Sequence, residues 1–331
     1  MVRGAPPIFV GLDAQGGQLV THAFAQRRVT IHDFMRTLSA ARLPRNEARL
    51  LLAHVLHRNH AWLVAHDDYA PSDDELAQIS ALAARRIAGE PVAYLIGERE
   101  FYGRVYRCSP ASLIPRPETE LLIEQALHLL SIRPRIESGA SAERIEGSDR
   151  TSLRILDVGT GTGCIAITLA LERPNAVVTA IDISSAALAL ARDNATRLGA
   201  NLTFIESNWF SALVPTHPKF DLIVSNPPYI VPADPHLSQG DLRFEPAIAL
   251  TDAVDGLESY RQLARGAQSY LRAGGVLLVE HGYDQGESVP ALLAACGLVN
   301  IVTHHDLAGH PRVTAAQKRR STRGRSKPGA W

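Results

Sequence analysis

The run Ser225-Asn226-Pro227-Pro228-Tyr229 carries groups that could hold a planar amino group. Two consecutive prolines fix the backbone and remove two N–H donors, which leaves their carbonyl oxygens as acceptors. A planar NH₂ could donate one hydrogen to the Asn226 side-chain oxygen and the other to the Pro227 carbonyl, with Tyr229 flat against it. Such a site works by positioning and needs no metal or covalent nucleophile. The segment predicts methylation of a planar nitrogen, as in glutamine amides or the amino groups of adenine and cytosine.

A glycine-rich turn could hold the cofactor of such a reaction. The run Asp157-Val158-Gly159-Thr160-Gly161-Thr162-Gly163-Cys164 follows a short apolar stretch. Glycines let the backbone turn tightly and approach a ligand beside a helix N-terminus. The dinucleotide fingerprint requires a glycine where this chain has Cys164, and Asp157 instead suits a positively charged methionine group. We therefore expect S-adenosylmethionine, held by Asp157, Gly159, Thr160, Gly161, Thr162 and Gly163.

Two further strand ends carry groups that suit the rest of this cofactor. Asp182 ends the second predicted strand, where its carboxylate could accept hydrogen bonds from both ribose hydroxyls. Asn208 and Trp209 follow the third strand, so that the amide could meet the adenine amino group and the indole could pack on the ring. With Asn226 in the same pocket, these residues complete the predicted cofactor site.

These groups can meet only if the elements that carry them form one sheet. After Arg154, apolar runs typical of strands cover residues 155–158, 177–181, 202–205, 222–225 and 276–280, with helical patterns at 164–171 and 184–198. This alternation is typical of a parallel sheet with helices on both faces. Ligands bind beyond the carboxyl ends of strands in such a sheet, where the candidate residues lie. The predicted fold class is α/β, with a Rossmann-like methyltransferase domain.

The chain of 331 residues is long enough for two domains. Between Thr30 and Ala88 apolar residues recur three and four apart, and Ser72 with Glu75 forms a capping-box pattern, which predicts a small helical bundle. We divide the chain into a disordered extension (1–28), a helical substrate-binding domain (29–90), a hairpin linker with a connecting helix (91–130), a flexible insert (131–152), the methyltransferase domain (153–313) and a basic disordered tail (314–331).

The composition narrows the class of protein. The formal net charge is zero, so no global field draws the chain to nucleic acid or to a membrane. No apolar run reaches about 18 residues, the length that a membrane helix needs. The three cysteines are far apart and lack metal-ligand spacing. We expect a cytoplasmic protein without a membrane span, disulfide or metal site, and a monomer.

Together the motifs resemble the peptide chain release factor N5-glutamine methyltransferase family (PrmC/HemK). Besides the glycine turn and the Asn-Pro-Pro-Tyr run, residues 111–120 are similar to the segment that links the family's two domains. Residues 234–237, 240–241 and 243–246 resemble its substrate-side loop, and residues 280–282 and 306–309 also fit. The resemblance covers roughly residues 30–313.

This resemblance implies a five-helix N-terminal domain and a seven-stranded class I methyltransferase domain. The implied reaction is methylation of N5 of the glutamine in the Gly-Gly-Gln motif of bacterial class 1 release factors, without nucleic acid. Carried over by position, the cofactor contacts would be Gly159 to Gly163, Asp182 and Trp209, and the glutamine contacts Asn226, Pro227, Pro228 and Tyr229. The family commonly has an acid at the position of Asn208, so we expect a weaker hydrogen bond to adenine.

Three other functions share part of this pattern. A glutamine methyltransferase acting on a ribosomal protein shares the site, but the loop at 234–246 resembles the release-factor type. An adenine N6-methyltransferase of DNA or RNA shares residues 226–229 but usually has a positively charged surface or a target-recognition domain. A non-enzymatic RNA-binding assembly factor would use the basic residues after Val313.

Overall fold

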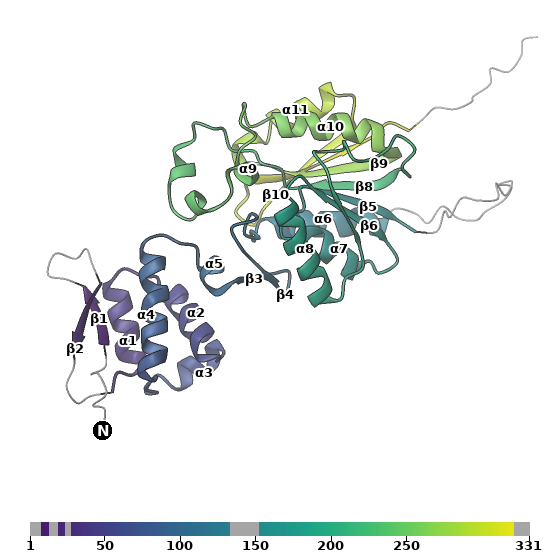
Figure 1. Cartoon of the computed structure of the whole chain (residues 1–331). Helices are drawn as coiled ribbons and strands as arrows, with labels where there is room; N and C mark the ends of the chain where they lie inside the picture. The colour runs from purple at the N-terminus through teal and green to yellow at the C-terminus, as the bar shows by residue number, and fades with distance from the viewer. Residues whose placement is uncertain (1–7, 13–18, 24–27, 133–151, 321–331) are drawn as a thin grey trace, which may run out of the picture. The chain divides into compact units, whose positions relative to one another are not determined.

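The computed structural model describes residues 8–12, 19–23, 28–132 and 152–320 (Figure 1). The chain divides into two compact units, Met1–Glu98 and Arg99–Trp331. The insert predicted at 131–152 lies almost wholly outside the described residues, as does the tail beyond residue 320. No helix of the described residues is long and apolar enough to cross a membrane.

Five helices between residues 31 and 96 surround one apolar core in the first unit. They are α1 (Ile31–Ala40), α2 (Arg45–Leu56), α3 (His60–Ala65), α4 (Asp73–Ile87) and α5 (Val92–Ile96). Capping boxes at Thr30 and Ser72 start α1 and α4, because their side chains accept from N–H groups that a helix start leaves unpaired. The core includes Leu51, Leu52 and Ile79. The helical bundle and the helix start at Ser72 are confirmed.

The segment after α4 departs from its prediction of strand and turn structure. Val92–Ile96 forms helix α5 instead, and Leu95 is buried in the helical core. Apolar side chains spaced three and four apart share one face of a helix, and their burial outweighs the strand preference of valine and isoleucine. Gly97 ends the helix with φ +79°. The expected hairpin follows as β3 (Glu98–Phe101) and β4 (Arg104–Arg107).

The extension at 1–28 contains two strands where the sequence predicts disorder. Strand β1 (Ile8–Leu12) pairs antiparallel with β2 (Leu19–Ala23), with Leu12 opposite Leu19. Both runs are rich in residues that favour strands, and Gly16 and Gly17 lie between them in the sequence. The other residues of the extension before position 28 lie outside the described residues.

The second unit is built on a seven-stranded sheet with the order β10-β11-β9-β8-β5-β6-β7. Strands β9, β8, β5, β6 and β7 run parallel, whereas β11 is antiparallel to both of its neighbours. The bounds are β5 (Arg154–Val158), β6 (Val177–Asp182), β7 (Thr203–Glu206), β8 (Phe220–Ser225), β9 (Leu271–Glu280), β10 (Val299–His305) and β11 (Pro311–Gln317). The α/β fold class and the seven-stranded Rossmann-like domain are confirmed.

Helices cover both faces of this sheet, so side chains along each strand alternate between two cores (Figure 1). On β5, Ile155 belongs to the core under α6 and α7, and Leu156 to the core under α10 and α11. The first face carries α6 (Thr119–Ile132), α7 (Cys164–Glu172) and α8 (Ser185–Leu198), and the second carries α10 (Glu258–Tyr270) and α11 (Ser288–Ala295). Three short 3₁₀ turns, η1 (Pro235–Ser238), η2 (Leu242–Phe244) and η3 (Tyr283–Gln285), and helix α9 (Ala247–Leu250) lie in the loops.

Strand β11 crosses the boundary at 313 that the sequence predicts between the catalytic domain and a disordered tail. It continues to Gln317, and Thr314, Ala315 and Ala316 are buried. Residues 313–317 pair with residues 276–280 of β9, so they belong to the sheet. The cluster of basic residues that suggested a tail begins only at Lys318. The expected boundary is therefore corrected to a position after Gln317.

Candidate active site

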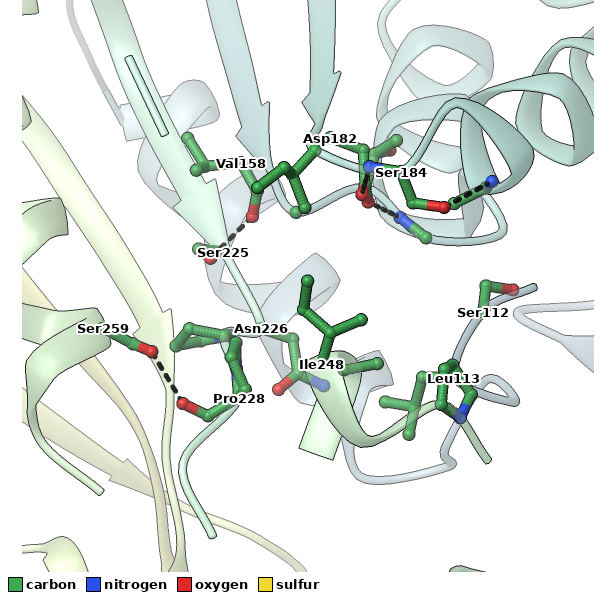
Figure 2. Close-up of a pocket in the computed structure, with 18 of the residues that line it drawn as sticks. Ser112, Leu113, Val158, Asp182, Ser184, Ser225, Asn226, Pro228, Ile248 and Ser259 are labelled. Atoms are coloured by element: carbon green, nitrogen blue, oxygen red, sulfur yellow. Dashed lines mark hydrogen bonds between the residues drawn. The ribbon is translucent and has the colours of Figure 1, made fainter. Parts of the chain in front are cut away.

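A cavity with a volume of about 510 Å³ lies at the carboxyl ends of β5, β6, β7 and β8 (Figure 2). The chain leaves β5 toward β6 on one side, while β8 lies on the other side of β5. Parallel sheets bind ligands at such a switch point because neighbouring loops diverge there. The strand ends contribute residues 158–162, 181–184, 207–209 and 225–228 to the cavity wall. All four candidate segments of the sequence meet here.

The glycine turn is tied to the end of the neighbouring strand β6. The N–H groups of Gly159 and Thr160 donate to the Ile181 carbonyl at 2.9 and 3.0 Å. The Gly161 N–H donates to Asp182 Oδ2 at 2.9 Å. Gly159 and Gly161 have φ of +75° and +56°, which favour glycine because other residues are strained there. The turn therefore runs along the cavity with its backbone close to any bound ligand.

Asp182 holds this turn and also lines the cavity (Figure 2). Its Oδ1 accepts from the Ser184 N–H at 2.9 Å, and its Oδ2 accepts from Gly161. Burial raises the pKa of Asp182 above its usual value, against the backbone hydrogen bonds from Ser184 and Gly161. A carboxylate offers about four lone-pair positions, so two N–H donors leave room for ligand hydroxyls.

Two residues predicted to contact the cofactor do not line the cavity. Asp157 is fully buried, and its Oδ2 accepts from the Thr160 hydroxyl at 2.7 Å. Burial raises the pKa of Asp157 to about 7. A Cβ on Gly163, whose φ is +82°, would stand 2.7 Å from Ile167 Cδ1 and 3.1 Å from Ala191 Cβ. In this structure Asp157 supports the turn and Gly163 allows α7 to pack against α8, and contact of either residue with the cofactor stays a prediction.

The wall around Asn226 is held by hydrogen bonds on both sides. Asn226 Nδ2 donates to Thr119 Oγ1, the first residue of α6, at 3.1 Å. The Ser225 hydroxyl donates to the Val158 carbonyl at 2.7 Å, and the Ser259 hydroxyl donates to the Pro228 carbonyl at 2.8 Å (Figure 2). These bonds fix the strand end before Asn226 and the loop after it. Asn226, Pro227 and Pro228 line the cavity as the sequence predicts.

Tyr229 is not among the residues that line the cavity. Its half-buried side chain packs against the apolar core under α10 and α11. Burial is the main cause that raises the pKa of its phenol. Its carbonyl accepts from Gln285 Nε2 at 3.4 Å, which holds the end of the loop. The expected stacking of this ring on the substrate stays a prediction.

The adenine pocket predicted after β7 forms part of the same wall. Asn208 is exposed and lines the cavity, and Trp209 is half-buried beside it. Trp209 has φ +51°, and its carbonyl accepts from the Ser207 hydroxyl at 2.7 Å. Ser207 also accepts from the Ala212 N–H at 3.1 Å. The turn is thereby held in an uncommon backbone conformation, as often occurs beside functional sites.

Much of the remaining wall comes from two segments that were not predicted as site residues, within 111–116 and 246–253, and helix α10 adds Glu258, Ser259 and Gln262. Arg116 pairs with Glu245, whose side chain has no exposed surface. Glu245 Oε2 also accepts from the Ile114 N–H at 2.9 Å. This pair joins the segment at 111–116 to Glu245, which directly precedes the segment at 246–253. The signal available in the sequence was the opposite charge of Arg116 and Glu245, each of which stands beside a proline.

No group of three or more His, Cys, Asp or Glu side chains within the described ranges could hold a metal ion. The cavity wall mixes apolar side chains, such as Ile114 and Ile248, with carboxylate and amide side chains, among them Asp182, Asn208 and Asn226. Such a surface can bind a mostly apolar ligand and direct it by a few polar contacts.

Sequence comparisons connect both units to known families. Residues 30–97 match the PrmC N-terminal domain family, and residues 149–318 match a methyltransferase domain family. The chain is 50% identical over 272 residues to a release factor glutamine methyltransferase of Bordetella pertussis, which covers 82% of this chain and 94% of the relative. A relative of the same name from Escherichia coli is 41% identical over 285 residues, with 86% and 96% covered.

Solved structures give a weaker likeness. A methyltransferase from Pyrococcus furiosus matches with a TM-score of 0.46 and 17% identity, covering 72% of this chain and 99% of that structure. A ribosomal protein L11 methylase from Lactobacillus delbrueckii matches with a TM-score of 0.41 and 20% identity, covering 62% and 80%. These values are too low to add to the sequence comparisons.

Proposed function

The chain belongs to the release factor glutamine methyltransferase family, and we propose that it methylates N5 of the glutamine in the Gly-Gly-Gln motif of release factors. One observation carries the proposal beyond the family. The Asn226 amide lines a cavity at the ends of β5, β6 and β8, and its nitrogen is occupied by Thr119. The amide oxygen is therefore the end that can accept from a substrate NH₂.

The cavity fits S-adenosylmethionine, which supplies an electrophilic methyl group on positively charged sulfur when it is bound. The cavity volume of about 510 Å³ lies within the range of about 300–1,000 Å³ that is common for ligand pockets. Asp182 would accept from the ribose hydroxyls, and Asn208 and Trp209 would hold the adenine ring. The backbone of residues 159–162 would lie along the methionine part. Asp157 and Gly163 would act only through the shape of the turn.

The chain's contribution to methyl transfer is to hold the glutamine amide. Asn226 Oδ1 would accept one N–H of the substrate and the Pro227 carbonyl the other. The carbonyls of Pro228 and Tyr229 already accept from Ser259 and Gln285, so they fix the loop instead. Orientation of this kind can contribute as much as about 7–11 kcal/mol to lowering a barrier.

Apolar side chains border the place proposed for the substrate amide. Ile114 and Pro115 of the segment at 111–116 line the cavity, as does Ile248 of the segment at 246–253. A low local dielectric strengthens the hydrogen bonds that hold the amide. We assign no general base: the two acceptor oxygens would hold both amide protons while the methyl group is transferred, and one proton would then be lost to solvent. We also propose that a monomer acts without nucleic acid.

Methylation of a purified release factor tests the proposed function. The full chain and labelled S-adenosylmethionine are incubated with the factor or with the same factor carrying Gln→Ala in its Gly-Gly-Gln motif. Label on the first and none on the second is expected. Label on both would place the reaction at another residue. Label on a ribosomal protein or on adenine in DNA, with none on the factor, would overturn the substrate.

A further inference from the structure

Exposed apolar side chains gather at the edge of the sheet where the cavity lies. In the described part of the second unit, the five most exposed large apolar side chains are Val214, Ile248, Val254, Tyr283 and Leu307. All but Val214 follow the carboxyl end of β8 or β9 or lie in the turn between β10 and β11. Leu307 is fully exposed and Tyr283 is 64% exposed, and neither lines the cavity. Apolar surface that is both exposed and contiguous often marks a site where another protein binds.

The turn that carries Leu307 extends from the same edge of the sheet as the cavity. Strand β11 is antiparallel to β9, and Val313 pairs with Glu280, the last residue of β9. The residues that precede β11 therefore continue beyond the carboxyl end of β9. Strand β9 in turn neighbours β8, whose end lines the cavity. Neighbouring strands are about 4.8 Å apart, so β11 is about 10 Å from β8.

A series of contacts joins this turn to the loop that follows β8. The ring centroids of His310 and Tyr283 are 5.8 Å apart. Gln285, in the same 3₁₀ turn as Tyr283, donates from Nε2 to the carbonyls of Gly256 and Tyr229 at 2.9 and 3.4 Å. Gly256 and Tyr229 belong to the loop after β8, part of which lines the cavity. The exposed side chains at this edge therefore belong to one continuous surface that begins at the cavity.

Asp306 holds the turn around Leu307 in a fixed shape. Its Oδ1 accepts from the N–H groups of Ala308 and His310 at 3.0 and 2.9 Å. Its Oδ2 pairs with Arg312 at 3.5 Å. A turn that is fixed before binding loses little conformational entropy when a partner binds, so the contacts of Leu307 can contribute to affinity.

We propose that Leu307 and Tyr283, together the apolar rim, form a docking surface for the release factor whose glutamine enters the cavity. The inference rests on the proposed function, because it places the rest of that substrate. A glutamine side chain is short, so the protein surface around it must lie against this edge of the sheet. A standard interface buries about 800 Å² on each partner, which is a patch with a radius of about 16 Å. Because β11 is about 10 Å from β8, the apolar rim falls within that radius.

Binding of an unreactive substrate tests the apolar rim. The full chain is titrated with a release factor that carries Gln→Ala in its Gly-Gly-Gln motif. Leu307→Asp would bury an unpaired carboxylate and Tyr283→Ala would remove an aromatic contact, so each should raise the dissociation constant about 10- to 30-fold. Val214→Asp is the control, because Val214 is also exposed but lies beside Leu213, whose carbonyl accepts from the Tyr270 hydroxyl next to the amino end of β9. This control should bind like the wild type.

Methylation kinetics with the unmodified release factor separate docking from catalysis. In both rim variants the KM for the release factor should rise about 10- to 30-fold. The value of kcat and the dissociation constant of S-adenosylmethionine should stay near those of the wild type, because neither residue lines the cavity. Thermal unfolding shows whether each variant is folded at the assay temperature, and if one rim variant is unfolded, the other decides.

Unchanged binding and KM in the rim variants would overturn the inference, as would an equal loss in Val214→Asp. A lower kcat with unchanged KM would also overturn it, because the rim would then act on the shape of the active site. Sedimentation gives a further check: a dimer formed by the wild type and lost in Leu307→Asp, with KM unchanged, would assign the rim to a second copy of this chain. A wild type that binds the release factor without methylating it would instead refute the proposed function and leave the docking surface in place.

Discussion

The side-chain amide of Asn226 has an acceptor at one end and a donor at the other, so its role depends on which end faces the cavity. The amide nitrogen donates to Thr119 Oγ1 at 3.1 Å. At the scale of single residues, orientation is thus decided by hydrogen bonds to neighbouring residues of the protein. The same holds for Asp182, whose two oxygens are set by Gly161 and Ser184.

Replacing Asn226 by alanine should remove the acceptor that positions the substrate and leave most of the cofactor contacts intact. We expect kcat to fall about 10²- to 10³-fold, as when a donor aimed at a reacting group is lost. The dissociation constant of S-adenosylmethionine, measured by calorimetry, should change less than about threefold. Asn226→Asp is a useful companion, because it keeps an acceptor but loses the donor to Thr119. Equal losses of kcat and cofactor affinity would show that Asn226 has been assigned the wrong role.

Among the elements, strand β11 was assigned in part to a disordered tail, because basic residues follow it directly in the sequence. Ala315 and Ala316 are small residues with little strand preference, and basic residues begin at Lys318. The strand forms because it fills the space between β9 and β10 and pairs with both. It also supports the cavity side of the sheet, since Thr314 Oγ1 bonds His281 Nε2 at 2.9 Å beside Glu280.

Deletion of residues 314–331 should therefore destabilise the catalytic unit. The lost strand pairing alone removes about 1 kcal/mol for each hydrogen bond, and the buried alanines add to it. Deletion of residues 321–331 is the matched control and should leave β11 intact. Chemical denaturation should show a clear fall in the unfolding free energy only for the longer deletion. Equal stabilities would contradict the assignment of residues 314–317 to the sheet. The shorter deletion also tests RNA binding by the basic residues it removes, because it spares the fold.

For the whole molecule, the balance of charge distinguishes protein from nucleic-acid substrates. The chain has 34 basic and 34 acidic residues, so it has no net field toward a phosphate backbone. Its N-terminal unit matches a family found in glutamine methyltransferases of release factors, and the apolar core of that unit is separate from those around the sheet. Binding of a protein substrate is therefore expected to depend on shape and apolar contacts more than on charge.

Release factor methylation should accordingly depend weakly on salt. Between about 50 and 200 mM salt, kcat/KM should fall less than about tenfold, whereas proteins with many phosphate contacts lose about 10³–10⁵ in affinity. Added DNA or RNA should not compete. The measurement is the initial rate at low release factor concentration across a salt series. A steep decrease with salt, or competition by nucleic acid, would favour the nucleic-acid methyltransferase alternative.

The sequence alone determined the α/β class, the glycine turn and the Asn-Pro-Pro-Tyr run, because these depend on periodicity and turn stereochemistry within a few residues. Only the tertiary structure showed that Asp157 and Gly163 do not line the cavity and that Thr119 and Glu245 belong to its surroundings. Thr119 lies 107 positions from Asn226, and Ile114 lies 131 positions from Glu245. Contacts across such separations depend on how helices and strands pack, which no local pattern of residues specifies.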